Sequence, residues 1–175
     1  SKTGVNAVSF AAYNGHFDIV KYFISLPNFK LHNTLGLHDV VYYAAISEYN
    51  DIFEYIIDLC EQQKIETIQL IRQTAEAHYP RIKLPDDILN NTIEPSAVVI
   101  KLEEMNEEDQ RHKAQIAEHK LIRDICSTMP DQYHLWQYYK YYYPRICQRV
   151  CGYAQQRGAD TIIKFLKKKH LFYEP

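Results

Sequence analysis

The sequence contains little glycine and little proline, with 5 and 7 among 175 residues. Folds built from many short strands and turns use more of both, so this scarcity argues against them. No stretch approaches the roughly 18 uninterrupted apolar residues of a membrane span. The net charge is only −2, so no overall field attracts the chain to nucleic acid or membrane. The 46% hydrophobic content suffices for a core, and the composition predicts a soluble, mainly helical protein.

Sequence motifs of common enzyme chemistry are also absent. We find no Gly-rich phosphate loop, no strand-turn-helix nucleophile motif, no paired-His zinc motif and no calcium loop. The histidines are scattered singly: His16, His32, His38, His78, His112, His119, His134 and His170. Nothing assembles a nucleophile, a base and an orienting group. We therefore expect no catalytic residues, no metal site and no cofactor.

The four cysteines are Cys60, Cys126, Cys147 and Cys151. The last two lie four residues apart in a helical pattern, which is a poor geometry for a disulfide. We interpret all four as reduced, buried cysteines that pack as small hydrophobic residues. A zinc site formed by Cys147, Cys151 and a distant His is the alternative, but a second closely spaced ligand pair is lacking.

An internal repeat opens the chain, with a spacing of 33 residues. Three segments recur at this offset: Phe10-Ala11-Ala12 as Tyr43-Ala44-Ala45, Asp18-Ile19-Val20 as Asp51-Ile52-Phe53, and Tyr22-Phe23-Ile24 as Tyr55-Ile56-Ile57. Two small alanines allow one helix to approach its neighbours closely, and the apolar stripe from Ile19 to Ile24 predicts a second helix against it. Gly15 can adopt the left-handed conformation that ends the first helix. Such hairpins bury their apolar faces only by stacking.

Residues 9–22 resemble the ankyrin repeat at its most diagnostic stretch. Gly4 stands at the position of the family's turn glycine, although Asn6-Ala7-Val8-Ser9 replaces the usual Thr-Pro-Leu-His. The second unit is more divergent, because Gly36 is one residue out of register and Glu48-Tyr49-Asn50 replaces Asn-Gly-His. The resemblance covers residues 4–26 and 36–60, which is about a third of the chain.

This resemblance implies an all-α fold, an ankyrin-like helical-hairpin solenoid fragment followed by a non-repeat helical C-terminal region. The expected domains are residues 1–62, with two ankyrin-like repeats, and residues 63–175, a helical capping or extension region. The chain opens inside a unit without a polar N-terminal cap. We therefore expect it to be the C-terminal piece of a longer protein, with the array truncated at its N-terminus. A segment after residue 60 must cover the second unit.

The ankyrin resemblance also implies a module that binds another protein through a concave face and performs no chemistry. Carried over by position, that face comprises Val5, Asn6, Ser9, Tyr13, Asn14, His38, Asp39, Tyr42, Ile46 and Ser47. The Tyr-, Asn- and Ile-rich composition with a non-repeat tail is similar to secreted ankyrin effectors of intracellular bacteria such as Legionella, although protozoan ankyrin proteins look similar. The expected location of the protein is the cytoplasm. The effector similarity implies a eukaryotic host protein as the partner and, for an effector, translocation into the host cytoplasm.

The remaining sequence predicts further helices. One continues over residues 61–77 and stops at Tyr79-Pro80, an irregular link covers 80–96, and helices follow over 96–105 and 106–126. Near the C-terminus, Ala154 to Gly158 and then Ile162 to Leu166 echo the first repeat at an offset of 143. This echo predicts a closing helical hairpin, either a degenerate ankyrin unit or two short helices joined by a Gly turn; we favour the latter.

A tyrosine-rich helix is predicted over residues 132–143, opened by Pro130-Asp131, with Pro144 beginning the next helix. It carries six tyrosines and Trp136 within eleven positions. Aromatic residues this dense cover every face of a helix, so they either form the core or create a second protein-binding patch. The candidate residues of that patch are Tyr133, Trp136, Tyr138, Tyr141 and Tyr142.

Two alternatives to a recognition module remain open. One is an enzyme with a cysteine- or metal-dependent site in residues 80–175, to which the repeats bring the substrate. The other is a purely structural cap of a longer array. A stoichiometric metal signal, or one thiol that reacts far faster than the others, would favour the enzyme.

Overall fold

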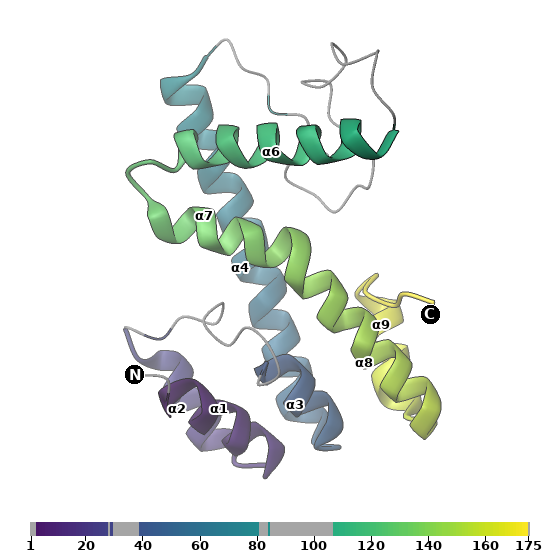
Figure 1. Cartoon of the computed structure of the whole chain (residues 1–175). Coiled ribbons are helices and arrows are strands. Elements are labelled where there is room, and N and C mark those ends of the chain that lie inside the picture. Colours follow the sequence, from purple (N-terminus) through teal and green to yellow (C-terminus); the bar gives the residue numbers. More distant parts are fainter. Residues whose placement is uncertain (1–2, 28, 30–38, 81–83, 85–106, 175) are drawn as a thin grey trace. The chain divides into compact units, whose positions relative to one another are not determined.

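The computed structural model describes residues 3–27, 29, 39–80, 84 and 107–174, with the side chains of 3–6 and 107–108 excepted. All regular secondary structure in these ranges is helical (Figure 1), which confirms the all-α prediction for this part of the chain. The chain divides into two compact units. Unit 1 joins residues 1–62 with 142–175, and unit 2 comprises residues 63–141.

Unit 1 contains three helical hairpins, each formed by two consecutive helices and a short turn. The first hairpin pairs α1 (Thr3–Tyr13) with α2 (Phe17–Ser25). The second pairs α3 (Val40–Ile46) with the beginning of α4 (Asn50–His78). The third pairs α8 (Tyr143–Arg157) with α9 (Asp160–Lys168).

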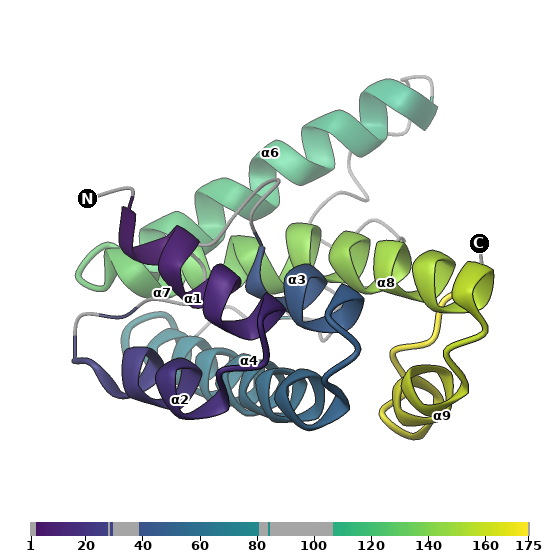
Figure 2. The same cartoon turned by 90° about the horizontal axis from the view of Figure 1, so that it is seen from below.

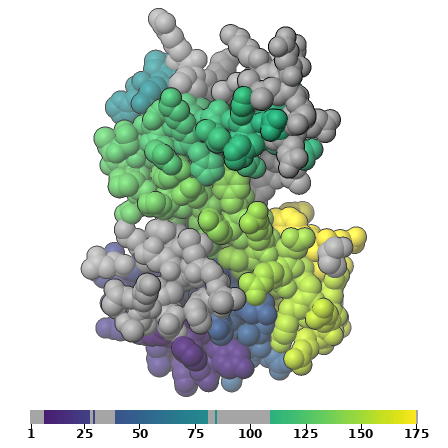
Figure 3. Space-filling model, viewed as in Figure 1, coloured from purple at the N-terminus to yellow at the C-terminus, as the bar shows by residue number. Residues whose placement is uncertain are grey.

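The three hairpins stack in order and form two layers (Figure 2). α1 packs against α3, and α3 packs against α8, so the first helices of the hairpins form one layer. In the other layer, the ring of Phe17 in α2 lies 5.2 Å from that of Tyr55 in α4. Phe53 of α4 lies 5.9 Å from Phe165 of α9. Figure 3 shows the same order, from the purple atoms of the first hairpin through blue to yellow-green.

The turn inside each hairpin contains one residue in the left-handed conformation. These residues are Gly15, Glu48 and Gly158, with φ of 75°, 64° and 64°. The first and third turns also share a hydrogen bond: His16 N donates to Ala11 O, and Ala159 N donates to Ala154 O, both at 2.9 Å. This six-to-one bond is typical of a helix that ends in a Schellman motif.

The geometry of the turns refines two predictions. The predicted closing hairpin is confirmed, and its turn repeats the first turn at the offset of 143 residues. In the second hairpin, Glu48 occupies the position of Gly15, so the segment that replaces Asn-Gly-His is Ser47-Glu48-Tyr49 rather than Glu48-Tyr49-Asn50. Gly4 lies within α1, which begins at Thr3, so the turn expected at Gly4 is wrong.

The C-terminal segment covers the second hairpin. The Tyr153 hydroxyl donates to the Ile46 carbonyl at 3.4 Å, and the Lys169 ammonium lies 2.6 Å from an oxygen of Asp58. The structure therefore groups residues 142–175 with residues 1–62, whereas the sequence placed them with residues 63–141. Pairings across a hundred residues leave no local pattern, which is why the sequence could not place this boundary.

Unit 2 packs the rest of α4 with α6 (Glu107–Ile125) and α7 (Pro130–Gln137). Its core holds Ile71, Ala75, Ile122, Ile125, Cys126, Tyr133 and Trp136. The helices predicted over 61–77 and 106–126 are confirmed, and Tyr79 follows the end of α4 as expected. The link predicted over 80–96 lies largely outside the described residues, and the helix over 96–105 lies entirely outside them.

A helix begins beside Pro144 as predicted, since α8 (Tyr143–Arg157) has this proline at its start, and no break separates it from the preceding helix. α7 passes directly into a π-helical turn (Tyr138–Tyr142), and α8 follows at Tyr143. Proline has no N–H to donate to the carbonyl four residues earlier, which here belongs to Lys140. A wider π-helical turn just before the proline accommodates the missing bond without a break in the helix.

Candidate functional site

The structure separates the residues predicted for the concave face. Tyr13 and Asn14 are exposed, and Tyr42, Ile46 and Ser47 are half-buried. Ser9 and Asp39 are buried, and the side chains of Val5, Asn6 and His38 lie outside the described residues.

Asp39 is buried because it caps a helix. Its side chain accepts a hydrogen bond from Val41 N at 2.7 Å, which satisfies a free N–H of the first turn of α3. Ser9 lies on the side of α1 that faces the core, beside the buried Val8 and Ala12. Neither side chain is available to a partner, so the predicted surface must exclude both.

A row of aromatic rings crosses the α1–α3–α8 layer. The ring of Tyr13 meets that of Tyr43 edge-on at 6.0 Å, and Tyr43 meets Tyr42 edge-on at 6.4 Å. The guanidinium of Arg149 in α8 lies 4.4 Å from the centre of the Tyr42 ring. We call these four residues the tyrosine row. Aromatic rings and arginine are the side chains that most often dominate binding at protein interfaces.

Sequence reasoning missed Tyr43 and Arg149 as members of this surface. The repeat pattern identifies Tyr43 only as the counterpart of Phe10, and Arg149 lies 107 residues from Tyr42. The available signal was the C-terminal echo of the repeat. Extending it from residue 154 back to residue 149 would have placed Arg149 on the helix that follows α3 in the stack.

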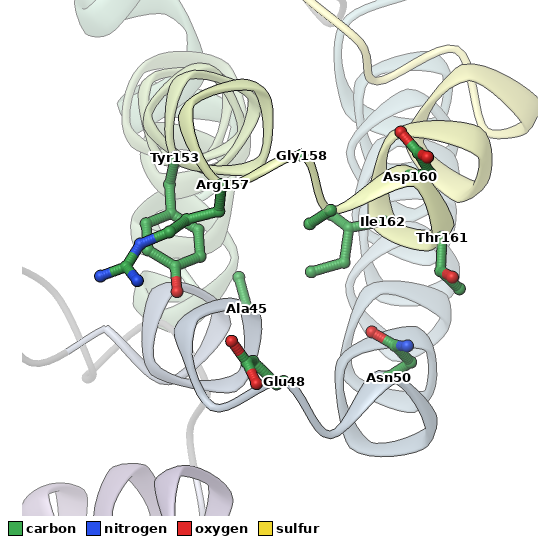
Figure 4. A pocket seen from close by; sticks show the side chains of 10 residues that line it. Ala45, Glu48, Asn50, Tyr153, Arg157, Gly158, Asp160, Thr161 and Ile162 are labelled. Carbon is green, nitrogen blue, oxygen red and sulfur yellow. The ribbon is translucent and has the colours of Figure 1, made fainter.

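A pocket of about 410 Å³ lies between the turns of the second and third hairpins. Tyr153 and Arg157 reach from α8 toward the turn that bears Glu48 (Figure 4). The Arg157 guanidinium lies 5.7 Å from the centre of the Tyr153 ring. Asn50, Asp160 and Thr161 line the other side. The lining mixes both charges and no polar group in it is deeply buried, so we assign no ligand.

The tyrosine-rich segment contributes mostly to the core. Tyr133, Trp136 and Tyr138 are buried and Tyr141 is half-buried, whereas Tyr142 is exposed. The second candidate patch therefore reduces to one exposed ring. Of the two interpretations left open by the sequence, core packing describes the other members of the set.

A polar network surrounds the Tyr133 hydroxyl in unit 2. Arg123 and Gln137 donate to this oxygen at 3.2 and 3.1 Å, and His119 Nδ1 lies 3.0 Å away. Because the oxygen already accepts two hydrogen bonds, its own proton points to His119 Nδ1 when the ring carries its proton on Nε2. Rings of Trp136 and Tyr141 pack on the imidazole at 5.0 and 5.1 Å.

Burial lowers the pKa of His119, and the charges of Lys140 and Arg123 lower it further against the opposing effect of Glu118. The imidazole is therefore neutral near pH 7 and able to accept the Tyr133 proton. Glu118 and Lys140 form an ion pair at 3.1 Å in which each side chain is only 7% exposed. The network satisfies polar groups inside a core, and this is the role that its geometry supports.

The cysteines are free and buried, as predicted. Burial raises the pKa of the Cys126 thiol to about 11 and also raises that of Cys147 and Cys151. Because the thiolate is the nucleophilic form, burial makes these three thiols less reactive than a free cysteine.

Within the described residues, no three His, Cys, Asp or Glu side chains converge as a metal site would require. In the same ranges, no helix has the length and apolar character needed to cross a membrane. No protein-family model, no curated protein and no solved structure matches this chain. Any functional assignment must therefore come from the residues and the geometry described above.

Proposed function

We propose that this chain is a protein-recognition module of the ankyrin type, with no chemistry of its own. The observation that supports the proposal is the turn geometry of unit 1, which repeats from one hairpin to the next. Gly15, Glu48 and Gly158 adopt the same left-handed conformation at equivalent positions in three successive hairpins. Stacked repeats of this kind build rigid, extended surfaces, which suit protein binding better than catalysis.

The tyrosine row is the proposed binding surface. A rigid scaffold holds Tyr13, Tyr42 and Tyr43 beside Arg149, so little side-chain entropy is lost on binding. The partner would bury these rings and pair a carbonyl or carboxylate with the guanidinium. A host protein as partner, and delivery by a bacterium into host cytoplasm, remain the sequence-based expectation for this module.

The test is capture of proteins from eukaryotic cytosol by the chain and by a Tyr13→Ala/Tyr42→Ala variant. The control is Tyr142→Ala/Ile116→Ala, which removes two exposed side chains (47% and 56%) that are not members of the row. Circular dichroism must show that both variants are folded. A protein retained by the parent and the control but lost by the Tyr13/Tyr42 variant supports the proposal. Equal retention by all three chains contradicts it.

A further inference from the structure

Three of the exposed large apolar side chains of the first hairpin have counterparts in the other two hairpins that are more buried. Phe10 is 60% exposed, Ile19 is 45% exposed and Tyr22 is 63% exposed. We call these three residues the end face. The equivalent residues of the second and third hairpins show which contacts each side chain makes when another hairpin precedes it.

The position of Phe10 is aromatic in every hairpin, as Phe10, Tyr43 and Tyr153. Tyr43 packs edge-on against Tyr13 of the preceding hairpin at 6.0 Å. Tyr153 donates its hydroxyl to the carbonyl of Ile46, which is the counterpart of Tyr13. In both cases the side chain reaches back to the end of the preceding first helix.

Tyr22 belongs to a second aromatic position, which continues as Tyr55 and Phe165. Tyr55 packs against Phe17 of the preceding hairpin with ring centres 5.2 Å apart. Phe165 packs against Phe53 of the preceding hairpin at 5.9 Å. Phe53 is the counterpart of Val20, because the counterpart of Phe17 is Asn50. Both aromatic positions therefore form part of the contact with the preceding hairpin.

The third position of the end face is isoleucine in all three hairpins. Ile52 and Ile162 are only 1% and 3% exposed, whereas Ile19 is 45% exposed. Identical side chains at equivalent positions thus differ in burial according to whether a hairpin precedes them. The end face carries the same side-chain types as the two filled interfaces.

The other end of the stack has a different character. The third-hairpin counterparts of Tyr13 and Phe17 are Gln156 and Asp160, and both are exposed. A second copy of the chain stacked head to tail would place these polar groups against Phe10 and Tyr22. At these positions the second hairpin has the apolar Ile46 beside the polar Asn50, whereas the third hairpin has one polar and one charged side chain. Burial of an unpaired carboxylate is unfavourable, so this end of the chain is a poor occupant.

We infer that the end face binds one further helical hairpin, stacked in the register of the other three. The hairpin must present an apolar residue at the end of its first helix, as Tyr13 and Ile46 do. It must present another in the first turn of its second helix, as Phe17 and Phe53 do. This inference goes beyond the proposed function, because it concerns the end of the stack and not the tyrosine row. It rests on the contacts of the filled interfaces.

The test extends the chain by one repeat. Residues 4–36 are duplicated in front of residue 4, which preserves the 33-residue period. In the added copy, the counterparts of Phe10, Ile19 and Tyr22 become Ser, so that the new end is polar. Ile19→Ser in the original copy is then compared in the unextended and extended chains by thermal unfolding. The control is Ile116→Ser, at a position 56% exposed.

In the unextended chain, Ile19→Ser should leave Tm within about 1 °C of the parent's value, because the substitution of an exposed side chain removes few contacts. In the extended chain, it should lower Tm by roughly 4 °C, since the same substitution opens a buried interface. Ile116→Ser should be silent in both chains. Hydrogen exchange should show protection of the added helices.

Three outcomes would overturn the inference. The first is an Ile19→Ser substitution that is as silent in the extended chain as in the unextended one. The second is an added copy whose amides stay unprotected. The same sequence folds against the second hairpin in the parent chain, so a lack of protection would mean that the end face does not offer an equivalent surface. The third is an unextended chain that sediments as a dimer and is dissociated by Ile19→Ser, which would make a second copy the occupant. None of these depends on Tyr13 or Tyr42, so the proposed function is tested separately.

Discussion

The two units are stabilised in different ways. In unit 1, side chains of one type recur at equivalent positions and are buried to the same degree, as Ile52 and Ile162 are. In unit 2, a single core encloses Trp136 together with a polar network and the buried pair of Glu118 and Lys140. A repeat supplies an internal reference, so the role of a residue can be inferred from its counterpart. A core without repeats offers no such reference, and each contact must be tested by itself.

The largest expected effect is in unit 2, at the buried ion pair. Lys140→Met should lower the free energy of unfolding by about 3 kcal/mol, because it leaves the Glu118 carboxylate buried without its cation. Chemical denaturation followed by the fluorescence of Trp136, the only tryptophan, measures the change.

The double variant Lys140→Met/Glu118→Leu is the matched control. It should recover most of the loss, because no buried charge remains. If Lys140→Met is as stable as the parent, solvent reaches the ion pair, and unit 2 does not depend on a buried charge pair in the way that distinguishes it from unit 1.

The next effect tests the turns of unit 1. Gly15→Ala should cost about 1.5 to 2 kcal/mol, because Ala is strained at φ 75° and the exposed ring of Tyr49 must move away from the added Cβ. Gly158→Ala has a similar φ of 64° but no atom near the added Cβ. It should therefore cost only about 1 kcal/mol. Equal losses in urea unfolding would mean that contact between the turns contributes nothing.

The pH dependence of stability separates the units further. The pKa of His119 in the folded chain lies below its ordinary value of 6.5. As the pH is lowered, the unfolded chain therefore binds a proton at this residue at a higher pH than the folded chain does. The contribution of neutral His119 to the free energy of unfolding should therefore be complete above pH 6.5, and the free energy of unfolding should fall as the pH drops below that value. Denaturation curves between pH 8 and 5, read from Trp136 fluorescence, measure this slope.

His119→Gln should reduce that slope, because the titrating group is gone while Gln can still accept a hydrogen bond from Tyr133. The groups whose charges affect His119 are Lys140, Arg123 and Glu118. A slope unchanged in the variant would assign the pH dependence to other histidines.

The smallest expected effect is a gain in stability. Glu48 adopts a left-handed φ of 64° that a glycine adopts without strain. Glu48→Gly should therefore raise the free energy of unfolding by about 0.5 to 1 kcal/mol. Glu48→Gln serves as the control for the loss of charge and should be close to neutral. A destabilised Glu48→Gly variant would show that the second turn depends on contacts of the glutamate side chain.

Much of unit 1 could be predicted because its determinants are local. The 33-residue period, the apolar stripe after Ile19 and the glycines at 15 and 158 all act within a few residues of the chain. The candidate site could be predicted only in part. Tyr13 and Tyr42 lie at the surface that the repeat pattern indicates, but Asp39 is withdrawn from it by its capping bond to Val41 N.

The sequence by itself therefore determined the helical class, the hairpins and the ends of several helices, since apolar periodicity and left-handed turns depend on neighbouring residues. Only the tertiary structure decided that residues 142–175 close the stack begun by residues 1–62. It alone also decided that Arg149 lies on Tyr42 and that His119 meets Tyr133. The spacing of His119 and Tyr133 follows no period, and the echo at an offset of 143 indicates the helix of Arg149 but not its contact with Tyr42. The fold alone therefore creates both contacts.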